Sequence, residues 1–252
     1  LMRLIIFGDS YAQPYPHVDW VWTNQLKQFD SVINHAVSGS SIEYSINKFY
    51  EYFENDYATT DKIVFLLTDS CRAPIVHNDY NPEWACYINV LDVQQKTGRD
   101  DKGTQSGMEQ HHTDYADYYK TVLNYTDPKI NYYKYFSVLS MLNNLKNDII
   151  VLPCFETYTS KLKLNENIIL TKLPLIEICN AEIIGRHADV TWIYPNLDFR
   201  LNHILPDNHK IFADTITQCF QTRQDQFRLN NFKQDQIGRR NAHKFMWIKE
   251  LL

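Results

Sequence analysis

The sequence predicts an α/β fold, a three-layer α/β/α sandwich of the flavodoxin-like type with a parallel sheet of about five strands. Short, continuous apolar segments recur along the chain, as is typical of strands buried on both faces, at residues 4–7, 62–67 and 148–153. Segments with apolar residues at helical spacing separate the early strands. No linker-like stretch divides the 252 residues, so we expect one large domain.

The first quarter of the chain predicts a βαβαβ series. Its apolar residues at helical spacing include Val18, Val21, Trp22, Leu26 and Phe29, and Ser40 or Ser41 can cap the second helix. In order, the expected strand, helix, strand, helix and strand occupy residues 4–7, 18–29, 31–37, 42–53 and 62–67. Such a series predicts right-handed crossovers and ligands bound beyond the carboxyl ends of the strands.

The remainder of the chain is less regular. We expect an irregular insertion at residues 73–113 and mainly helix over 114–147, interrupted near Asp127-Pro128. Three further strands and a last helix are expected at residues 148–153, 168–170, 190–194 and 206–220. The fold domain then spans residues 2–220. The polar extension at 221–252 could pack on this domain or hold a partner chain, and packing is the simpler interpretation.

Composition excludes several classes of protein. The chain has 25 Lys and Arg against 30 Asp and Glu, a net charge of −5, which gives no basic field for nucleic acid. Its five cysteines are scattered, which predicts neither a disulfide framework nor a zinc site, and no cofactor or metal motif is present. We find no signal peptide and no apolar run long enough to span a bilayer, which predicts a cytoplasmic protein.

Ser10 is the first candidate for chemistry. It ends the tripeptide Gly8-Asp9-Ser10 directly after the first expected strand, where doubly wound folds place their active sites. A serine hydroxyl there can act as a nucleophile. On these residues alone, however, a turn or helix cap formed by Asp9 or Ser10 is the simpler interpretation.

Two later segments change that balance. Residues 34–41 follow the second expected strand, and residues 200–213 lead into the last helix. Together with Gly8-Asp9-Ser10, their order and spacing resemble the blocks of the SGNH (GDSL) esterase and lipase family. The resemblance matches Ser10 to the nucleophile block, Gly39 to the glycine block and His203 to the histidine ten residues before a helical alanine.

This resemblance implies a serine hydrolase that needs no cofactor. Ser10 would be the nucleophile and His203 the base that removes its proton. The family stabilises the oxyanion with the backbone N–H groups of the serine and of the second-block glycine, here Ser10 and Gly39, and with an asparagine side chain.

The chain departs from the family at the third oxyanion donor. Asp69 stands where the family has asparagine, and an ionised carboxylate cannot donate a hydrogen bond. Either Thr68, Ser70 or Arg72 supplies the donor, or the oxyanion hole is weaker than usual.

A second departure concerns the acid that orients the base. The family places it three residues before the histidine, where this chain has Arg200. Asp198, five residues before His203, is the nearest upstream carboxylate and could complete a Ser10-His203-Asp198 triad if the loop bends. A solvated loop acid is an equally good interpretation of Asp198. A backbone carbonyl that orients the base in a dyad is a third.

By analogy with the family, we expect hydrolysis of an acetyl or short acyl ester, with a saccharide as one candidate for its alcohol part. The alternative is a noncatalytic binding or structural protein that kept the fold. Because the family also occurs in viruses and mobile elements, a virion-associated location is the alternative to a cytoplasmic one. The oligomeric state stays open.

Overall fold

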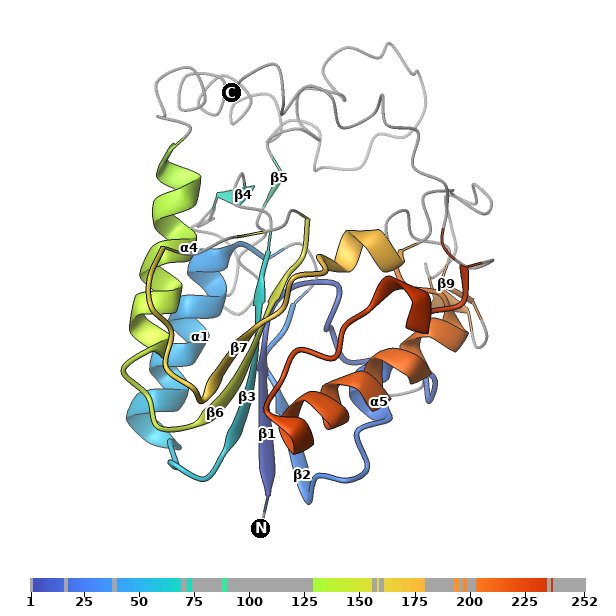
Figure 1. Cartoon of the computed structure of the whole chain (residues 1–252), viewed down its shortest axis with the longest axis horizontal. Helices are drawn as coiled ribbons and strands as arrows, with labels where there is room; N and C mark the ends of the chain where they lie inside the picture. The colour runs from blue at the N-terminus through green and yellow to red at the C-terminus, as the bar shows by residue number, and fades with distance from the viewer. Residues whose placement is uncertain are drawn as a thin grey trace, which may run out of the picture.

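The structure is a computed structural model that describes residues 2–15, 18–37, 40–68, 72–73, 88–89, 129–155, 158, 161–179, 193–194, 197–198, 203–234 and 237. Its centre is a five-stranded parallel sheet (Figure 1). The strands are, in spatial order, β2 (Ser31–Asn34), β1 (Arg3–Phe7), β3 (Lys62–Leu67), β6 (Asp148–Pro153) and β7 (Ile168–Leu170). The expected parallel sheet is therefore confirmed.

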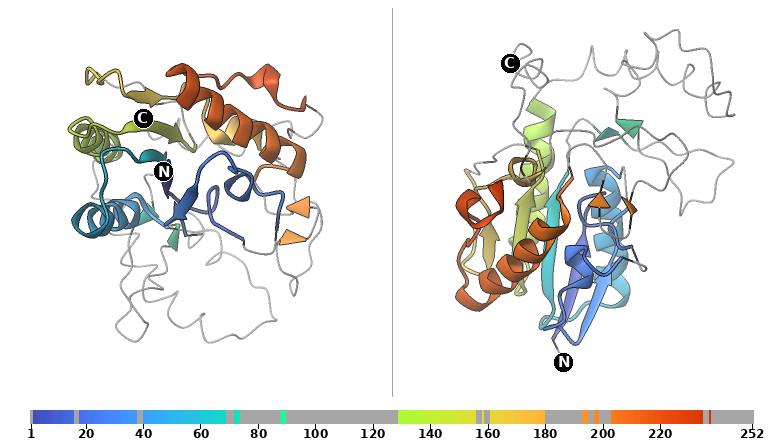
Figure 2. Two further views of the ribbon diagram at one scale, coloured as in Figure 1. Left: turned by 90° about the horizontal axis from the view of Figure 1, so that it is seen from below. Right: turned by 90° about the vertical axis from the view of Figure 1, so that its right-hand side faces the viewer.

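Helices cover both faces of this sheet. Figures 1 and 2 show α1 (Ile42–Asn55) and α4 (Lys129–Leu142) on one face and α5 (Pro206–Thr222) on the other. The three-layer arrangement predicted from the sequence is confirmed.

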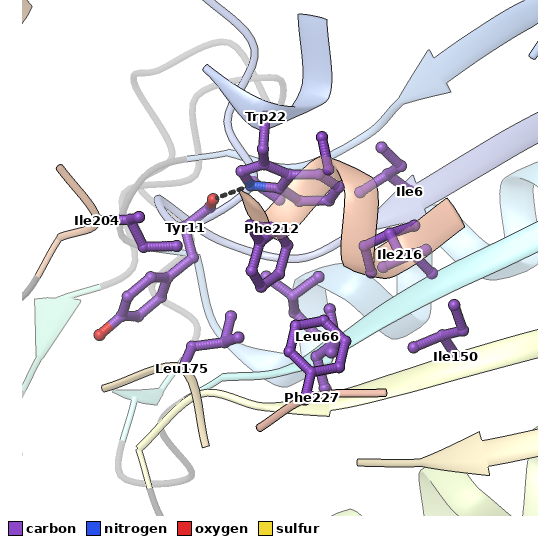
Figure 3. Close-up of a cluster of buried hydrophobic side chains, with 14 of the residues drawn as sticks. Ile6, Tyr11, Trp22, Leu66, Ile150, Leu175, Ile204, Phe212, Ile216 and Phe227 are labelled. Atoms are coloured by element: carbon purple, nitrogen blue, oxygen red, sulfur yellow. Dashed lines mark hydrogen bonds between the residues drawn. The ribbon is translucent and has the colours of Figure 1, made fainter. Parts of the chain in front are cut away.

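Two buried clusters hold the layers together. Because successive strand residues point to opposite faces, Leu4 and Ile6 of β1 pack toward α5, while Ile5 and Phe7 pack toward α1 and α4. Figure 3 shows part of the α5-side cluster. The labelled side chains are Ile6, Tyr11, Trp22, Leu66, Ile150, Leu175, Ile204, Phe212, Ile216 and Phe227. Both faces of the central strands are therefore buried, as their continuous apolar sequences predict.

The helix expected at residues 18–29 is wrong. Only the short 3₁₀ helix η1 (Trp22–Asn24) forms there. The side-chain amide of Asn24 donates to the carbonyls of Tyr15 (2.8 Å) and Val18 (3.0 Å), and the N–H of Trp22 donates to Nδ1 of His209 at 3.1 Å. These bonds satisfy backbone donors and acceptors that an α-helix would pair with each other, so they stabilise a non-helical conformation. The apolar spacing did identify buried residues, but it did not identify their backbone conformation.

Other expected elements are shorter or lie elsewhere. The second strand ends at Asn34 instead of residue 37. β8 (Ile193–Tyr194) pairs antiparallel with β9 (Leu197–Asp198), outside the main sheet. At the start of the expected insertion, β4 (Arg72–Ala73) pairs antiparallel with β5 (Ile88–Asn89), which lies within it. The rest of the insertion, and residues 114–128 of the expected helical region, lie outside the described residues.

The described part of the extension packs on the domain. After α5 the chain turns back, runs alongside this helix and forms the 3₁₀ helix η4 (Leu229–Asn231). Phe227 and Phe232 are each only 2% exposed and belong to the α5-side cluster. Residues 238–252, which include the apolar tip of the tail, lie outside the described residues. Among the helices described, none has the length and apolarity to cross a bilayer.

Candidate active site

Ser10 lies just beyond the carboxyl end of β1, one of the three central strands. β1 pairs with β2 on one side and with β3 on the other. From β1 the chain continues to β2, whereas from β3 it continues away from them toward β6. In sheets of this order, the crevice between strands whose connections leave in opposite directions is the usual place for a ligand. Ser10 is therefore positioned at the topological switch point.

The turn that carries Ser10 is fixed by its backbone. The Gly8 carbonyl accepts hydrogen bonds from the N–H of Val37 at 3.2 Å and from the Ser40 hydroxyl at 3.0 Å. The N–H of Ala12 donates to the carbonyl of Asp9 at 3.0 Å, which closes the turn around Ser10. The loop after β2 is thereby tied to the loop after β1.

Gly8 is required by close packing. A Cβ atom at this position would lie 2.8 Å from the Cβ of Leu66 on the adjacent strand, closer than carbon atoms pack. The absence of a side chain at Gly8 lets β1 leave the sheet directly beside β3.

Ser10 and His203 are in contact. The Ser10 Oγ and His203 Nε2 atoms are 3.0 Å apart, although the residues are 193 positions apart in the sequence. Ser10 is 7% exposed and His203 is partly buried. The distance is that of a hydrogen bond between a nucleophile and its general base. The structure thus brings together the two residues that the sequence motifs selected.

The N-terminal part of α5 positions His203. Pro206 begins this helix, where its missing N–H costs nothing because no intrahelical acceptor is available. His209, one turn further, is buried and accepts the N–H of Trp22 on Nδ1. Trp22 and Phe212 pack edge to face with centroids 4.8 Å apart. These contacts anchor the start of α5, and with it His203, to the segment that follows Ser10.

The side chain of Asp9 stabilises the turn that carries Ser10. Its buried carboxylate accepts the N–H of Tyr11 on Oδ1 at 3.1 Å and the hydroxyl of Thr68 on Oδ2. The carbonyl of Thr68 accepts in turn from the Tyr135 hydroxyl at 2.7 Å. Asp9 is therefore a turn-stabilising residue, which was the simpler interpretation of this position. The single hydroxyl proton of Thr68 is directed at Asp9, so we leave Thr68 out of the proposed oxyanion hole.

Tyr11 was missed by the sequence reasoning. Its ring stacks on the imidazole of His203, with centroids 5.3 Å apart and planes 20° apart. On the sequence, its only signal was its place directly after Ser10. The sequence alone does not tell which of the nine histidines this ring contacts.

The remaining predicted site residues are not tested. Asp198 lies in β9, but its side chain is not described, and the same holds for Arg72 in β4. Four further residues of the predicted site lie outside the described residues: Gly39, Asp69, Ser70 and Arg200. All the oxyanion donors, Ser10 included, and the residue that orients His203 therefore stay predictions. Within the described ranges, we find no group of three or more His, Cys, Asp and Glu side chains that could hold a metal ion.

Comparison with known proteins gives remote similarities. No protein-family model matches the chain, and no curated protein does. Among solved structures, a member of the lipolytic protein G-D-S-L family from Veillonella parvula DSM 2008 is 14% identical, with a TM-score of 0.32. That match covers 62% of this chain and 60% of the other.

A phospholipase A1 from Streptomyces albidoflavus NA297 is likewise 14% identical with a TM-score of 0.32, and its match covers 66% of this chain and 64% of the other. The chain thus spans less than two thirds of the length of either structure.

Proposed function

We propose that this protein is a serine hydrolase that cleaves carboxylic esters through an acyl-Ser10 intermediate. The single observation that carries the proposal is the 3.0 Å contact between Ser10 Oγ and His203 Nε2 at the carboxyl edge of the sheet. A serine hydroxyl is a weak nucleophile until a base takes its proton, and this contact supplies the base.

The proposed reaction has two halves. His203 Nε2, unprotonated at the start, takes the proton of Ser10 as Oγ attacks the ester carbonyl carbon. His203 then gives this proton to the alcohol oxygen as the carbon–oxygen bond to the leaving group breaks, which leaves acyl-Ser10. A water molecule repeats the sequence: its proton passes to His203, its oxygen attacks the acyl carbon, and Ser10 leaves with the proton. The products are an alcohol and a carboxylic acid.

The tetrahedral intermediates carry an oxyanion that needs hydrogen-bond donors. We assign the backbone N–H groups of Ser10 and Gly39 to this role, following the family motifs, with Ser70 as the candidate third donor in place of the family's asparagine. Loss of one donor of this kind costs about 2.7 to 4 kcal/mol of transition-state stabilisation. A hole with two donors would therefore support slower hydrolysis.

Asp198 is our candidate for orienting His203. It lies in β9, five residues before the histidine, and a carboxylate on Nδ1 would hold the tautomer that leaves Nε2 free to accept a proton. Asp198→Asn would then lower kcat with little effect on KM, whereas the dyad alternative expects almost no change. The measurement is a steady-state comparison of both proteins.

For the substrate we propose an acetyl or short acyl ester, with a saccharide as the candidate alcohol part. This finer assignment rests on the motif resemblance. It is tested with p-nitrophenyl esters of increasing acyl length, followed by acetylated saccharides. We expect kcat/KM to fall as the acyl chain grows beyond a few carbons.

The activity itself is tested with p-nitrophenyl acetate and a fluorophosphonate probe. We expect the wild type to hydrolyse the ester and to take up one probe molecule, mapped to Ser10. Ser10→Ala and His203→Ala should each lower kcat by about 10³-fold or more. Ser31→Ala, which removes an exposed hydroxyl in β2, is the matched control and should leave both readouts unchanged.

Equal, near-background rates for wild type and Ser10→Ala, without a probe adduct, would reject the enzyme. That result would favour the noncatalytic binding or structural protein.

A further inference from the structure

The ring of Tyr11 is held at the base by contacts on several sides. One face stacks on His203, and Phe155 packs against the ring edge to face, with centroids 5.6 Å apart and planes at 70°. Leu175 and Ile204 belong to the same buried cluster and lie near the ring in Figure 3. Tyr11 is only 5% exposed, so the ring has a fixed place beside the imidazole.

The backbone of Tyr11 is fixed as firmly as its ring. The indole N–H of Trp22 donates to the carbonyl of Tyr11 at 2.7 Å, shown as the dashed line in Figure 3. On the other side, the N–H of Tyr11 donates to the carboxylate of Asp9 at 3.1 Å. Displacement of the Tyr11 backbone would break one of these buried hydrogen bonds, and displacement of the ring would open a gap in the cluster; either costs free energy.

The phenol group of Tyr11 is unsuited to proton transfer. Burial raises the pKa of Tyr11 well above its usual value, and the neighbouring Cys179, Cys154 and Asp9 raise it further. Loss of the hydroxyl proton is therefore less favourable than for a solvent-exposed tyrosine. What Tyr11 offers His203 is the face of a neutral aromatic ring.

We propose that Tyr11 is a positioning residue for the hydrolysis, whose ring face holds the His203 imidazole in line with Ser10 and stabilises the imidazolium that forms during the reaction. This inference rests on the proposed function. An aromatic face attracts a cation placed over it, and this attraction is present only after His203 has taken the proton. The stack therefore favours the charged state through which the reaction passes over the resting state.

This role would compensate for an acidic residue that the sequence lacks at the expected position. Arg200 stands where the family places the acid that stabilises the imidazolium. An aromatic ring on the face of the imidazole leaves Nδ1 and Nε2, which lie in the ring plane, open to their hydrogen-bond partners. Tyr11 can therefore act together with Asp198 or with a backbone carbonyl.

The test compares Tyr11→Leu, which removes the aromatic face, with Tyr11→Phe, which keeps it and removes only the hydroxyl. The readout is the second-order rate of fluorophosphonate labelling at Ser10. We expect Tyr11→Leu to label about 10-fold more slowly than wild type and Tyr11→Phe to stay within about two-fold. If Tyr11→Leu does not fold, Tyr11→Met provides a flexible side chain that fills the same space without a ring.

A second readout separates positioning from a general loss of structure. The pKa of His203, followed by NMR on isotope-labelled protein, should fall by about half a unit in Tyr11→Leu and stay unchanged in Tyr11→Phe. The other titratable groups on the segments around His203 are the same in all variants, so the difference reports the ring. In the part of the chain that the structure describes, these groups include Asp9 in the turn, Asp207 and His209 in α5, and Cys154 and Cys179 beside Tyr11; Asp198 in β9 is a further candidate.

The outcomes are distinct. A labelled wild type with an equally reactive Tyr11→Leu variant would overturn this inference and leave the proposed function in place. Equal slowing in Tyr11→Phe and Tyr11→Leu would also overturn it, because the hydroxyl would then be the active part. A wild type that takes no label would overturn the proposed function itself.

Discussion

Gly8 and Asp9 are residues that support the proposed site through packing and hydrogen bonds, without a proposed role in the chemistry. Gly8 leaves room for Leu66. The carboxylate of Asp9 accepts hydrogen bonds from Tyr11 in the turn and from Thr68, which directly follows β3. The proposed catalytic pair, Ser10 and His203, is held by such neighbours. Substitutions at the neighbours should therefore affect stability and activity together, and matched variants can separate the two effects.

Gly8→Ala should destabilise the protein. The added Cβ would lie 2.8 Å from the Leu66 Cβ, and β1 and β3 would have to separate to relieve the overlap. Overpacking of this kind costs about 1 to 3 kcal/mol, measured as the fall in the free energy of unfolding in urea. An unchanged free energy of unfolding in Gly8→Ala would contradict the packing described here.

Thr68→Val should weaken the support of the turn. The substitution replaces the hydroxyl that bonds to Asp9 with a methyl group and leaves a buried carboxylate with one partner fewer. We expect a loss of about 1 to 3 kcal/mol of stability, with slower labelling of Ser10. Thr68→Ser keeps the hydroxyl and should retain most of the labelling rate. If the Val and Ser variants label at the same rate, the hydroxyl does not support the turn.

At the scale of elements, the sequence predicted best those segments whose conformation follows from their local pattern of apolar and polar residues. Lys62–Leu67 and Asp148–Pro153 were predicted with correct bounds, because a continuous apolar segment between polar ends has few alternatives to a buried strand. Four of the five apolar residues at helical spacing in 18–29 are buried and Val18 is partly buried, yet the segment forms no α-helix. There, the N–H of Trp22 donates a hydrogen bond to the distant side chain of His209, and the local sequence pattern cannot predict such a bond.

The candidate site divides in the same way. Ser10 and His203 could be selected because each lies in a recognisable block of sequence. Tyr11 could not, because its role arises from a ring contact with a residue 192 positions away, the difference between positions 203 and 11. Contacts of this kind depend on how α5 docks against the first loop, which is a property of the assembled layers.

The α1 helix offers a test at this scale. The hydroxyl of Ser40 donates to the carbonyl of Gly8, so the loop that leads into α1 is attached to the turn of Ser10. Ser40→Ala removes a buried hydrogen bond and should lower stability by about 1 kcal/mol and slow the labelling of Ser10. Ser41→Ala, one residue later, removes the helix cap instead and is the comparison. A similar labelling rate in both variants would exclude a special role of the Ser40 bond.

At the scale of the whole molecule, the sheet separates two hydrophobic clusters. Ile42 of α1 lies on one face and Ile216 of α5 on the other, and both are fully buried. Ile42→Val and Ile216→Val should each cost about 0.5 to 1.5 kcal/mol, and the double variant should lose their sum within about 0.5 kcal/mol.

The control for this additivity is a pair within one cluster. Phe212 and Phe227 are in contact on the α5 side, with ring centroids 5.1 Å apart. Phe212→Leu and Phe227→Leu should therefore combine with a coupling free energy of about 0.5 kcal/mol or more. Coupling as large between Ile42 and Ile216 would mean that the clusters do not act separately.

Acid should weaken the molecule at the end of the sheet opposite Ser10. Burial acts to raise the pKa of Asp61, but hydrogen bonds from Arg3 and Tyr52 outweigh it and hold the pKa below its usual value. Because Asp61 binds a proton less readily when folded than when unfolded, its contribution is present at neutral pH. It is lost as the pH falls below the unfolded value of about 3.9.

The measurement is urea unfolding at about pH 7 and about pH 3 for wild type and Asp61→Asn. Since an amide does not titrate here, the variant should lose less stability on acidification than the wild type. Equal losses in both proteins would mean that Asp61 is not responsible for the acid sensitivity.

The contact between Ser10 and His203 also has a consequence for synthesis. As the chain leaves the ribosome, β1 and its serine emerge early, but the imidazole follows only after nearly two hundred further residues have been translated. A nascent polypeptide arrested before α5 therefore carries the nucleophile without its base. The proposed esterase activity would appear only when α5 has docked, so the onset of labelling at Ser10 would report this docking.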